Sequence, residues 1–396
     1  QSSGVLLHSK KRVEKFLIML WQFIVYVITI PLALCFWSIM LTAMFFFEYV
    51  VRERSPSEKK EYIYGRNDVE GKNKERIDGL VTVTIVNWNG KEYIAACLNS
   101  VYSQTYKNIE CIVVDNYSID DSVEIIRNLY PQVRLIQNPS NYGFSRAHNQ
   151  AIKEAQGEYV LILNFDTVLE KDFIEKIIKV FQRDNTIGSI APKLIKSKNP
   201  KGTILDSTGI TMKLMFPHDR GQDEIEDGRY NESGPVFGVT GACAFYRHKT
   251  LEDIKVDGEW FDEDFGLYVE DVDLAWRAQL RGWKCYYLPD TVAFHKRGVT
   301  RINKPEIIRD YYITGYRNRY LAILKNAGIK DVLYNLGTVF SSEINFWRNA
   351  LCSKHCYAIR SMPNFIPLLF VIAKKRRGIQ IRRRVSVKEM TQWFFE

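Results

Sequence analysis

Tyr159-Val160-Leu161-Ile162-Leu163-Asn164-Phe165-Asp166-Thr167 is a run of five apolar residues that ends abruptly in polar ones. A short apolar run of this kind is typical of a strand buried on both faces in a parallel sheet. Ligands of open α/β sheets bind beyond the carboxyl ends of the strands, which makes Asp166 a candidate ligand-binding residue. An aspartate here could equally cap a helix starting near Glu170. The stretch alone does not separate the two interpretations.

The chain around this stretch alternates between strand and helix patterns. Apolar strand patterns occupy residues 81–86, 109–114 and 133–136, and helical patterns fill the intervals, the last of them at 144–155. Ser118 to Asp121 has the composition of a helix N-terminus. The alternation predicts an α/β fold with a Rossmann-like, mostly parallel, doubly wound sheet. The chain has neither GxGxxG nor GxxxxGK[ST], so the dinucleotide and P-loop fingerprints are missing.

Polar side chains follow three of the predicted strands, and we expect them to meet at one edge of the sheet. They are Asn87 and Asn89, Asp115 and Asn116, and Asn164 and Asp166. An ionised Asp115 only accepts hydrogen bonds. Uracil and thymine offer an N3–H donor where cytosine offers an acceptor, so this carboxylate would favour a uridine or thymidine nucleotide. A hard cation, Mg²⁺ or Mn²⁺, at Asp166 would bridge a diphosphate.

The second half of the pattern supplies a candidate general base. Residues 238–246 predict a tight turn that enters a buried strand, and a strand over 284–288 leads to His295. Between them, apolar residues at helical spacing predict a helix that starts with Glu270 and Asp271 and ends at Gly282. Acids at a helix N-terminus are favoured by its dipole, but a carboxylate held there could also act as a general base.

Five motifs in this order together carry a family resemblance. They are VTIVNWNG at 83–90, VVDN at 113–116, the segment from Asn138 to Phe144, NFDT at 164–167 and EDVDL at 270–274. As a set they resemble a family 2 glycosyltransferase with the GT-A fold, over roughly Leu80 to Arg319. The chain is most similar to the branch of rhamnosyltransferases and galactofuranosyltransferases that act on lipid-linked acceptors.

The resemblance implies a role for each candidate residue. Asp115 would contact the nucleobase, with Asn141, Gly143 and Arg146 near the nucleotide. Asp166 matches the metal-binding aspartate of the family's DXD motif, and His295 matches a histidine that completes metal or diphosphate binding in some members. Asp271, beside Glu270, matches the catalytic base. The motif Asn164-Phe165-Asp166 has only one carboxylate, so substrate oxygens would supply most of the metal's ligands.

Composition and charge indicate a membrane setting. The net charge of +9 suggests a polyanionic partner. No nucleic-acid-binding signature accompanies it, so no nucleic acid is expected. Phe16 to Phe47 contains no charged residue and is long enough to cross a bilayer. Pro31 at its midpoint and basic residues on both sides favour a re-entrant hairpin over a single span. A buried soluble helix pair is the third alternative.

The C-terminal region pairs an apolar stretch with a basic cluster. Residues 307–324 and 332–351 predict helices, and Asn364 to Ala373 is apolar but too short to span a bilayer. The basic residues that follow are Lys374, Lys375, Arg376, Arg377, Arg382, Arg383 and Arg384. This combination predicts an interfacial helix on anionic lipid. The alternative is a basic surface that packs on the catalytic domain.

These patterns divide the chain into a tag remnant and basic N-terminus (1–15), a membrane-inserted segment (16–51), a charged linker (52–79), a GT-A catalytic domain (80–300) and a basic, membrane-associating helical region (301–396). The seven scattered cysteines suit a reducing compartment, which places the catalytic domain on the cytoplasmic side.

The predicted function is a metal-dependent, inverting hexosyl transfer of one sugar, with rhamnose as a candidate, from a UDP- or dTDP-sugar to a polyprenyl-diphosphate-linked saccharide. A polymerase is disfavoured because the Gln-x-x-Arg-Trp motif of processive members is missing. Transfer to a polyprenyl or dolichyl monophosphate and a non-catalytic membrane scaffold are the alternatives, and the sequence leaves an oligomer open.

Overall fold

The computed structural model describes residues 76–199, 202–297, 305–337 and 368–395, with scattered positions between 31 and 45 and between 339 and 347. In chain order, the first elements are β1 (Ile77–Asn87), α3 (Ile94–Tyr102), β2 (Ile109–Asp115), α4 (Ser122–Leu129), β3 (Arg134–Gln137), α5 (Gly143–Glu154), β4 (Gly157–Asn164), β5 (Thr167–Leu169), α6 (Phe173–Arg183) and β6 (Ile187–Asn199). The next are β7 (Gly202–Ser207), β8 (Ile210–Thr211), η1 (Lys213–Met215), β9 (His218–Asp219), β10 (Gly234–Val236), β11 (Cys243–Arg247), α7 (His248–Asp253), α8 (Glu270–Leu280) and β12 (Lys284–His295). Four C-terminal helices follow: α9 (Pro305–Asn326), α10 (Ile329–Tyr334), α13 (Leu369–Ile381) and α14 (Val387–Phe395).

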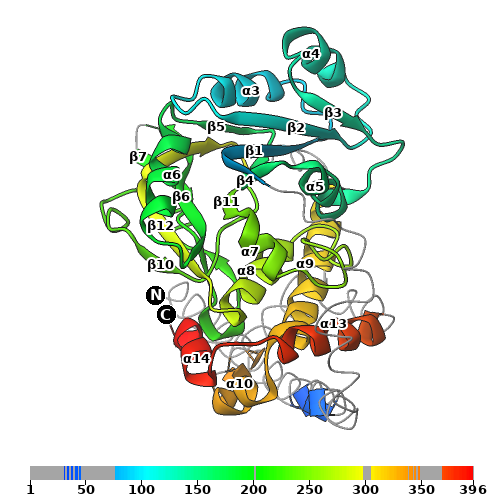
Figure 1. The fold of residues 1–396 in the computed structure, drawn as a ribbon. Coiled ribbons are helices and arrows are strands. Elements are labelled where there is room, and N and C mark those ends of the chain that lie inside the picture. Colours follow the sequence, from blue (N-terminus) through cyan, green and yellow to red (C-terminus); the bar gives the residue numbers. More distant parts are fainter. Residues whose placement is uncertain are drawn as a thin grey trace, which may run out of the picture.

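The strands join mainly into one sheet, in the order β10-β12-β6-β11-β4-β1-β2-β3 (Figure 1). β4, β1, β2 and β3 run parallel to one another, as do β6 and β12. β11 runs antiparallel to both of its neighbours, β4 and β6, and β5, β7 and β10 also pair antiparallel. The α/β class is confirmed and the arrangement fits a GT-A-like sheet. The expectation of a mostly parallel sheet is wrong, because β11 returns against β4 and makes the sheet mixed.

Helices cover both faces of this sheet. Strand β4 shows why: Leu161 and Leu163 pack with α3, α4 and α6 on one face, whereas Val160 and Ile162 pack with α5, α7 and α8 on the other. All four side chains are fully buried. The prediction of a strand buried on both faces is therefore confirmed.

Several predicted boundaries need correction. β1 already begins at Ile77, so the charged linker ends before Gly79. Helix α6 begins only at Phe173, which removes Asp166 from any capping position. Helix α4 begins at Ser122, so Ser118 lies in the loop ahead of it. α10 ends at Tyr334 and residue 335 lies in a turn. A helix that begins at Val332 and continues past residue 335, as predicted for 332–351, is therefore not observed.

The C-terminal helices lie together at the end of the molecule opposite α4 (Figure 1). One apolar core joins them to α8, and it includes Trp276, Tyr320, Ile372 and Trp393. No helix in the described part of the chain is long and apolar enough to cross a bilayer. The membrane segment predicted at 16–51 and the linker up to residue 75 lie outside the described residues, apart from isolated helical positions between 31 and 45.

The basic cluster of the C-terminal region is mostly engaged within the protein. Arg376 is buried and its guanidinium Nη1 donates to the Leu324 carbonyl oxygen at 2.7 Å. Arg383 pairs with Asp331 at 2.7 Å, and the Lys375 side chain is only 5% exposed. These cations pack on the protein instead of forming a free face toward lipid. Arg376 and Arg383 contact α9 and α10 of the same region, and Lys375 contacts Asp262 of the catalytic part.

Candidate active site

The sheet register brings the predicted polar residues to one edge. Asn87 at the end of β1 is the register partner of Asp115 at the end of β2. Val86, one residue earlier, is the partner of Asn164 at the end of β4. The carboxyl ends of three adjacent parallel strands therefore lie side by side, as the sequence predicted.

Asp115 is buried and held by its surroundings. Its Oδ1 accepts hydrogen bonds from Asn87 Nδ2 (2.8 Å) and Ser118 Oγ (2.6 Å), and its Oδ2 accepts one from the Ser118 backbone N–H (3.0 Å). Asn89, with φ of 52°, accepts from the Ile119 N–H at 2.8 Å and fixes the facing loop. These donors keep the carboxylate oriented as a hydrogen-bond acceptor, which is the role predicted for it.

A network of amides continues along the edge. Asn116 Nδ2 donates to Asn141 Oδ1 (2.9 Å) and to the Gly143 carbonyl oxygen (3.1 Å). Asn141 Oδ1 also accepts from the Gly143 N–H at 2.9 Å, which shapes the start of α5 where Gly143 has φ of +80°. Arg146 is half-exposed over the Tyr142 ring. The structure thus places Asn141 and Gly143 beside Asn116, and Arg146 over the neighbouring Tyr142 ring; their contact with a nucleotide stays a prediction.

Asp166 and His295 are partners. His295 Nε2 lies 3.3 Å from Asp166 Oδ1, and its Nδ1 lies 2.7 Å from Asp206 Oδ2. Asp206 in turn pairs with Arg297 at 2.6 Å, and Arg297 pairs with Asp219. Burial alone would lower the pKa of His295, but its hydrogen bonds to Asp166 and Asp206 and their charges raise it to about 9.

This pair has the chemistry of a partial divalent-cation site. A carboxylate is a suitable ligand for Mn²⁺, and His295 would ligate a cation only after losing the Nε2 proton that its raised pKa favours. The second carboxylate on Nδ1 is the usual device that orients a ligating histidine. No group of three or more acidic, histidine or cysteine side chains in the described residues could hold a metal ion. A cation held by Asp166 and His295 would have to take its remaining ligands from elsewhere, such as the oxygens of a substrate.

Asp271 is the second residue of helix α8 and contacts the turn before β11. Its Oδ2 accepts a hydrogen bond from the Gly241 N–H at 2.9 Å, and its Oδ1 accepts one from the Val272 N–H at 2.8 Å. Burial raises the pKa of Asp271 to about 6, although the Gly241 hydrogen bond opposes the shift. A carboxylate with this pKa is ionised at neutral pH and close enough to it to accept a proton.

Glu270 is a different case from its neighbour. It is 5% exposed, and its Oε2 is buried without a hydrogen-bond partner in the described structure. Burial, followed by the charge of Asp271, raises its pKa well above the usual range for a glutamate. Glu270 Oε2 lacks the hydrogen bonds that orient Asp271, so of the two predicted catalytic acids the structure favours Asp271.

Two connections tie Asp271 to the Asp166 side of the edge. The Asn164 N–H donates to the Ala242 carbonyl oxygen at 2.9 Å. Gly241, the residue before Ala242, donates its N–H to Asp271. The negative charge of Asp219, which pairs with Arg297 in the His295 network, also raises the pKa of Asp271. Asp115 and Asp166 thus lie at or just after the ends of β2 and β4, and Asp271 is connected to the end of β4 through Gly241 and Ala242.

Sequence reasoning missed the supporting residues. Asp206 is fully buried on β7 and Ser118 lies in the β2–α4 loop, yet they bind His295 and Asp115 directly. Ser118 was interpreted as part of a helix N-terminus. Its position three residues after Asp115 could have indicated a local Asx-type contact. Asp206 carries no such local signal, because its pairing with His295 spans 89 residues.

Comparison with known proteins agrees with the sheet edge just described. Residues 82–255 match the family model described as Glycosyl transferase family 2. Chondroitin synthase of Pasteurella multocida (strain Pm70) is 33% identical over 160 residues, which is 39% of this chain and 16% of that protein. Poly-beta-1,6-N-acetyl-D-glucosamine synthase of Staphylococcus aureus (strain COL) is 25% identical over 232 residues, 58% of this chain and 53% of that protein.

Among solved structures, the mannosyltransferase PcManGT from Pyrobaculum calidifontis, in complex with GDP-Man and Mn²⁺, superposes with a TM-score of 0.45 at 17% identity, over 89% of this chain and 97% of that one. The chain spans between a sixth and about half of the two curated relatives. The match to the family model covers residues 82–255 and ends before Asp271.

Proposed function

We propose that the protein is a membrane-associated, inverting glycosyltransferase that moves one sugar from a UDP- or dTDP-sugar to a lipid-linked saccharide in the assembly of a polysaccharide. The observation that carries this proposal is the single sheet edge with Asp115, Asp166 and Asp271, in a chain whose residues 82–255 match the family model. The relatives named above are polysaccharide synthases by name, which supports the product class.

In this mechanism each residue of the edge has one task. The Asp115 carboxylate accepts the N3–H of the pyrimidine base, and the amides of Asn116 and Asn141 shape the place of the ribose and diphosphate. Asp166 and His295 would hold a divalent cation, which neutralises charge on the leaving diphosphate when bound. Asp271 removes the proton from the acceptor hydroxyl as that oxygen attacks the anomeric carbon. Inversion follows because attack and departure occur on opposite faces of the sugar.

Donor turnover tests the proposal. Purified full-length protein in lipid vesicles is incubated with Mn²⁺ and, separately, UDP-N-acetylglucosamine, UDP-galactofuranose and dTDP-rhamnose, with extracted polyprenyl-diphosphate saccharides as acceptors. We expect release of the nucleoside diphosphate and a labelled lipid product from one donor. Asp271→Asn should keep nucleotide binding and lose at least a hundredfold in kcat. Near-normal turnover in that variant would exclude Asp271 as the base.

The panel also separates the alternatives left by the sequence. If a product forms only with polyprenyl monophosphate, the acceptor is that monophosphate and not a lipid-linked saccharide. Nucleotide binding without turnover of any donor would favour the non-catalytic scaffold. The rhamnosyltransferase-like branch stays a prediction that the dTDP-rhamnose reaction decides.

A further inference from the structure

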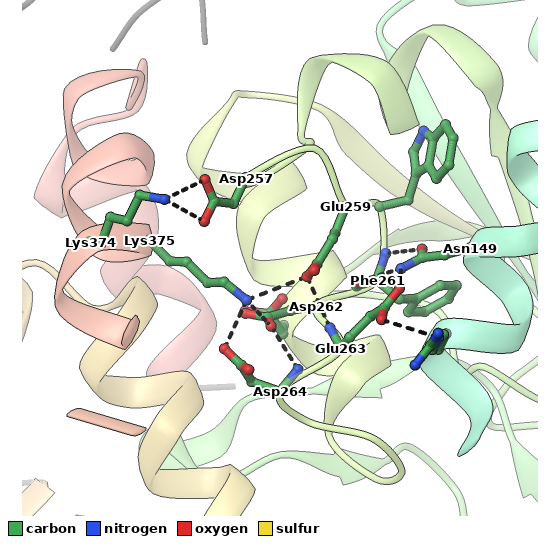
Figure 2. A network of polar contacts seen from close by, with 12 residues as sticks. Asn149, Asp257, Glu259, Phe261, Asp262, Glu263, Asp264, Lys374 and Lys375 are labelled. Atoms are coloured by element: carbon green, nitrogen blue, oxygen red, sulfur yellow. Dashed lines mark hydrogen bonds and ion pairs between the residues drawn. The ribbon is translucent and has the colours of Figure 1, made fainter. Parts of the chain in front are cut away.

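A lysine of the C-terminal helix α13 is buried among carboxylates far from it in sequence. Lys375 Nζ lies 2.5 Å from Asp262 Oδ1, 2.8 Å from Asp264 Oδ2 and 3.4 Å from Glu259 Oε2. Its side chain is 5% exposed. Figure 2 shows it directed toward Glu259, Asp262 and Asp264. All three carboxylates belong to the loop between α7 and α8. A helix near the end of the chain therefore holds the segment that leads into the helix of Asp271.

The contact continues from this loop into α8. Asp262, 1% exposed, also accepts a hydrogen bond from Lys325 of α9 at 2.5 Å, and Lys325 reaches Asp273 of α8 at 2.8 Å. Asp273 is fully buried and accepts further hydrogen bonds from Arg277 and Asn326. The result is an unbroken chain of charged groups from Lys375 through Asp262 and Lys325 to Asp273.

The members of this chain cannot move independently. Buried charges are stable only while they are paired, and removal of one partner leaves the others uncompensated. Without Lys375, Asp262 would keep only Lys325, which it shares with Asp273, and the loop would lose the cation that holds Glu259, Asp262 and Asp264 together. Their mutual repulsion then favours opening of the loop.

The same loop also contacts the nucleotide side of the edge. Asn149 of α5 donates to the Phe261 carbonyl oxygen at 2.8 Å and accepts from the Phe261 N–H at 2.9 Å (Figure 2). The Ser145 N–H donates to the Gly266 carbonyl oxygen at 3.1 Å. The loop thus joins the start of α5 to α8, where Asp273 lies two residues after Asp271.

We propose that Lys375 is a positioning residue for the transfer reaction: through Asp262, Lys325 and Asp273 it fixes the start of α8, and with it the Asp271 carboxylate, relative to the bound donor. This inference rests on the proposed function for its kinetic consequence and on the ion-pair chain for its structural one. Lys375 itself touches no predicted substrate group, so its effect belongs in kcat and not in donor binding.

Lys374 provides a matched control on the same helix. It is 54% exposed and pairs with Asp257, which is 42% exposed, at the surface (Figure 2). We expect Lys375→Met to lower kcat at least tenfold with an unchanged KM for the best donor of the panel and an unchanged affinity for UDP. Lys375→Arg should recover most of the loss, and Lys374→Met should change kcat less than twofold. Equal kcat values in the two methionine variants would overturn the proposal.

Hydrogen exchange gives a readout that does not need turnover. In Lys375→Met we expect the amides of residues 270–274 to exchange at least tenfold faster than in the wild type, and in Lys374→Met at the wild-type rate. Unchanged exchange in Lys375→Met would overturn the inference even if no donor of the panel is used. A wild type without turnover, but with the expected exchange difference, would instead count against the proposed function alone.

Asp264→Asn covers the case in which Lys375→Met does not fold. Asp264 is 26% exposed and is only one of three carboxylates on Lys375. This variant keeps both lysines, and we expect it to lower kcat about threefold and to speed exchange at residues 270–274. Wild-type values for both measurements would contradict the positioning role.

Discussion

The Asp271 carboxylate combines two properties that a general base needs, a hydrogen bond that orients it and a pKa near neutrality. Gly241 supplies the hydrogen bond, and burial raises the pKa to about 6. A group with a raised acid pKa binds its proton more tightly in the folded state than in the unfolded chain. Its ionisation above pH 6 therefore costs folding free energy.

This cost predicts a stability gain when the charge is removed. Below pH 4 the Asp271 carboxyl is protonated in both states, so Asp271→Asn should match the wild type. Between pH 4 and 6 only the unfolded chain ionises, and the wild type loses stability progressively. At pH 8 we expect the variant to be more stable by about 1–3 kcal/mol. Urea unfolding across this pH range measures the difference, and equal stability at pH 8 would contradict the raised pKa.

The second prediction concerns Asp115 and the choice of nucleobase. Its two oxygens face only donors in the described structure, namely Asn87 and Ser118. An asparagine offers one acceptor, so its NH₂ group must face either Ser118 or the base. We expect Asp115→Asn to weaken UDP binding at least tenfold, about 1.4 kcal/mol or more, and to narrow the preference for UDP over CDP.

Calorimetric titration with both nucleotides measures this preference. Asp121→Asn is the control, because its carboxylate is 67% exposed in the same loop and contacts only Lys91 in the ion pair shown. An unchanged ratio of UDP to CDP affinity in Asp115→Asn would show that another group reads the base.

The rule that ligands bind at strand ends makes Asp115 and Asp166 candidates from sequence alone, because each lies within three residues of the end of an apolar run. Asp206 could not be predicted in this way. It lies on β7, which pairs antiparallel with β6, and only the three-dimensional arrangement brings it to His295. Residues with a local signal are thus predictable from sequence, and residues that orient them from distant strands are not.

At the scale of elements, the start of α8 is held in an unusual conformation. Tyr268 and Val269 have φ values of 71° and 70°, in the left-handed region that side chains other than glycine rarely adopt. Asn318 of α9 is fully buried, and its Nδ2 lies within hydrogen-bond distance of the carbonyl oxygens of Phe265, Leu267 and Tyr268. One amide therefore stabilises the backbone just before the candidate base.

Removal of this amide should destabilise the segment. In Asn318→Ala the carbonyl oxygens of Leu267 and Tyr268 lose the Asn318 donor, whereas that of Phe265 keeps the Leu267 N–H and Arg317. We expect the free energy of unfolding to fall by about 2–4 kcal/mol. Arg309→Ala on the same helix is the control, because Arg309 is 51% exposed and pairs only with its neighbour Asp310 in the contacts described. Urea unfolding of both variants measures the effect, and a loss in Asn318→Ala no larger than in the control would contradict this role.

Helix α8 itself was predictable because its apolar spacing and its closing glycine are local features. The helices that hold it were predicted as elements, but their role was not. Lys375 and Asp262 are separated by 113 residues, and the basic cluster of α13 suggested lipid as its partner. The positive charge was expected to bind anionic groups, but the anionic partners of Lys375 and Arg383 are carboxylates of the same chain.

At the scale of the whole molecule, the mixed sheet and the C-terminal helices share one core. Trp276 of α8 and Phe237 lie within it together with Trp393 and Phe394 of α14. The ring centroids of Phe237 and Trp393 are 6.1 Å apart, and those of Trp276 and Phe394 are 5.9 Å apart. The shared aromatic contacts indicate that the sheet and these helices unfold as one cooperative unit.

Trp393→Ala tests this cooperativity. The change removes a large side chain that is only 7% exposed, so we expect the unfolding free energy to fall by about 3–5 kcal/mol. Because the core is shared, tryptophan fluorescence and the stabilisation of the protein by UDP should be lost at the same urea concentration. Phe395→Ala, the adjacent residue at 58% exposure, should change neither midpoint appreciably. If Trp393→Ala instead unfolds in two steps and keeps UDP binding through the first, the C-terminal helices are an independent unit. The positioning role that we assign to Lys375 would then lose its physical basis.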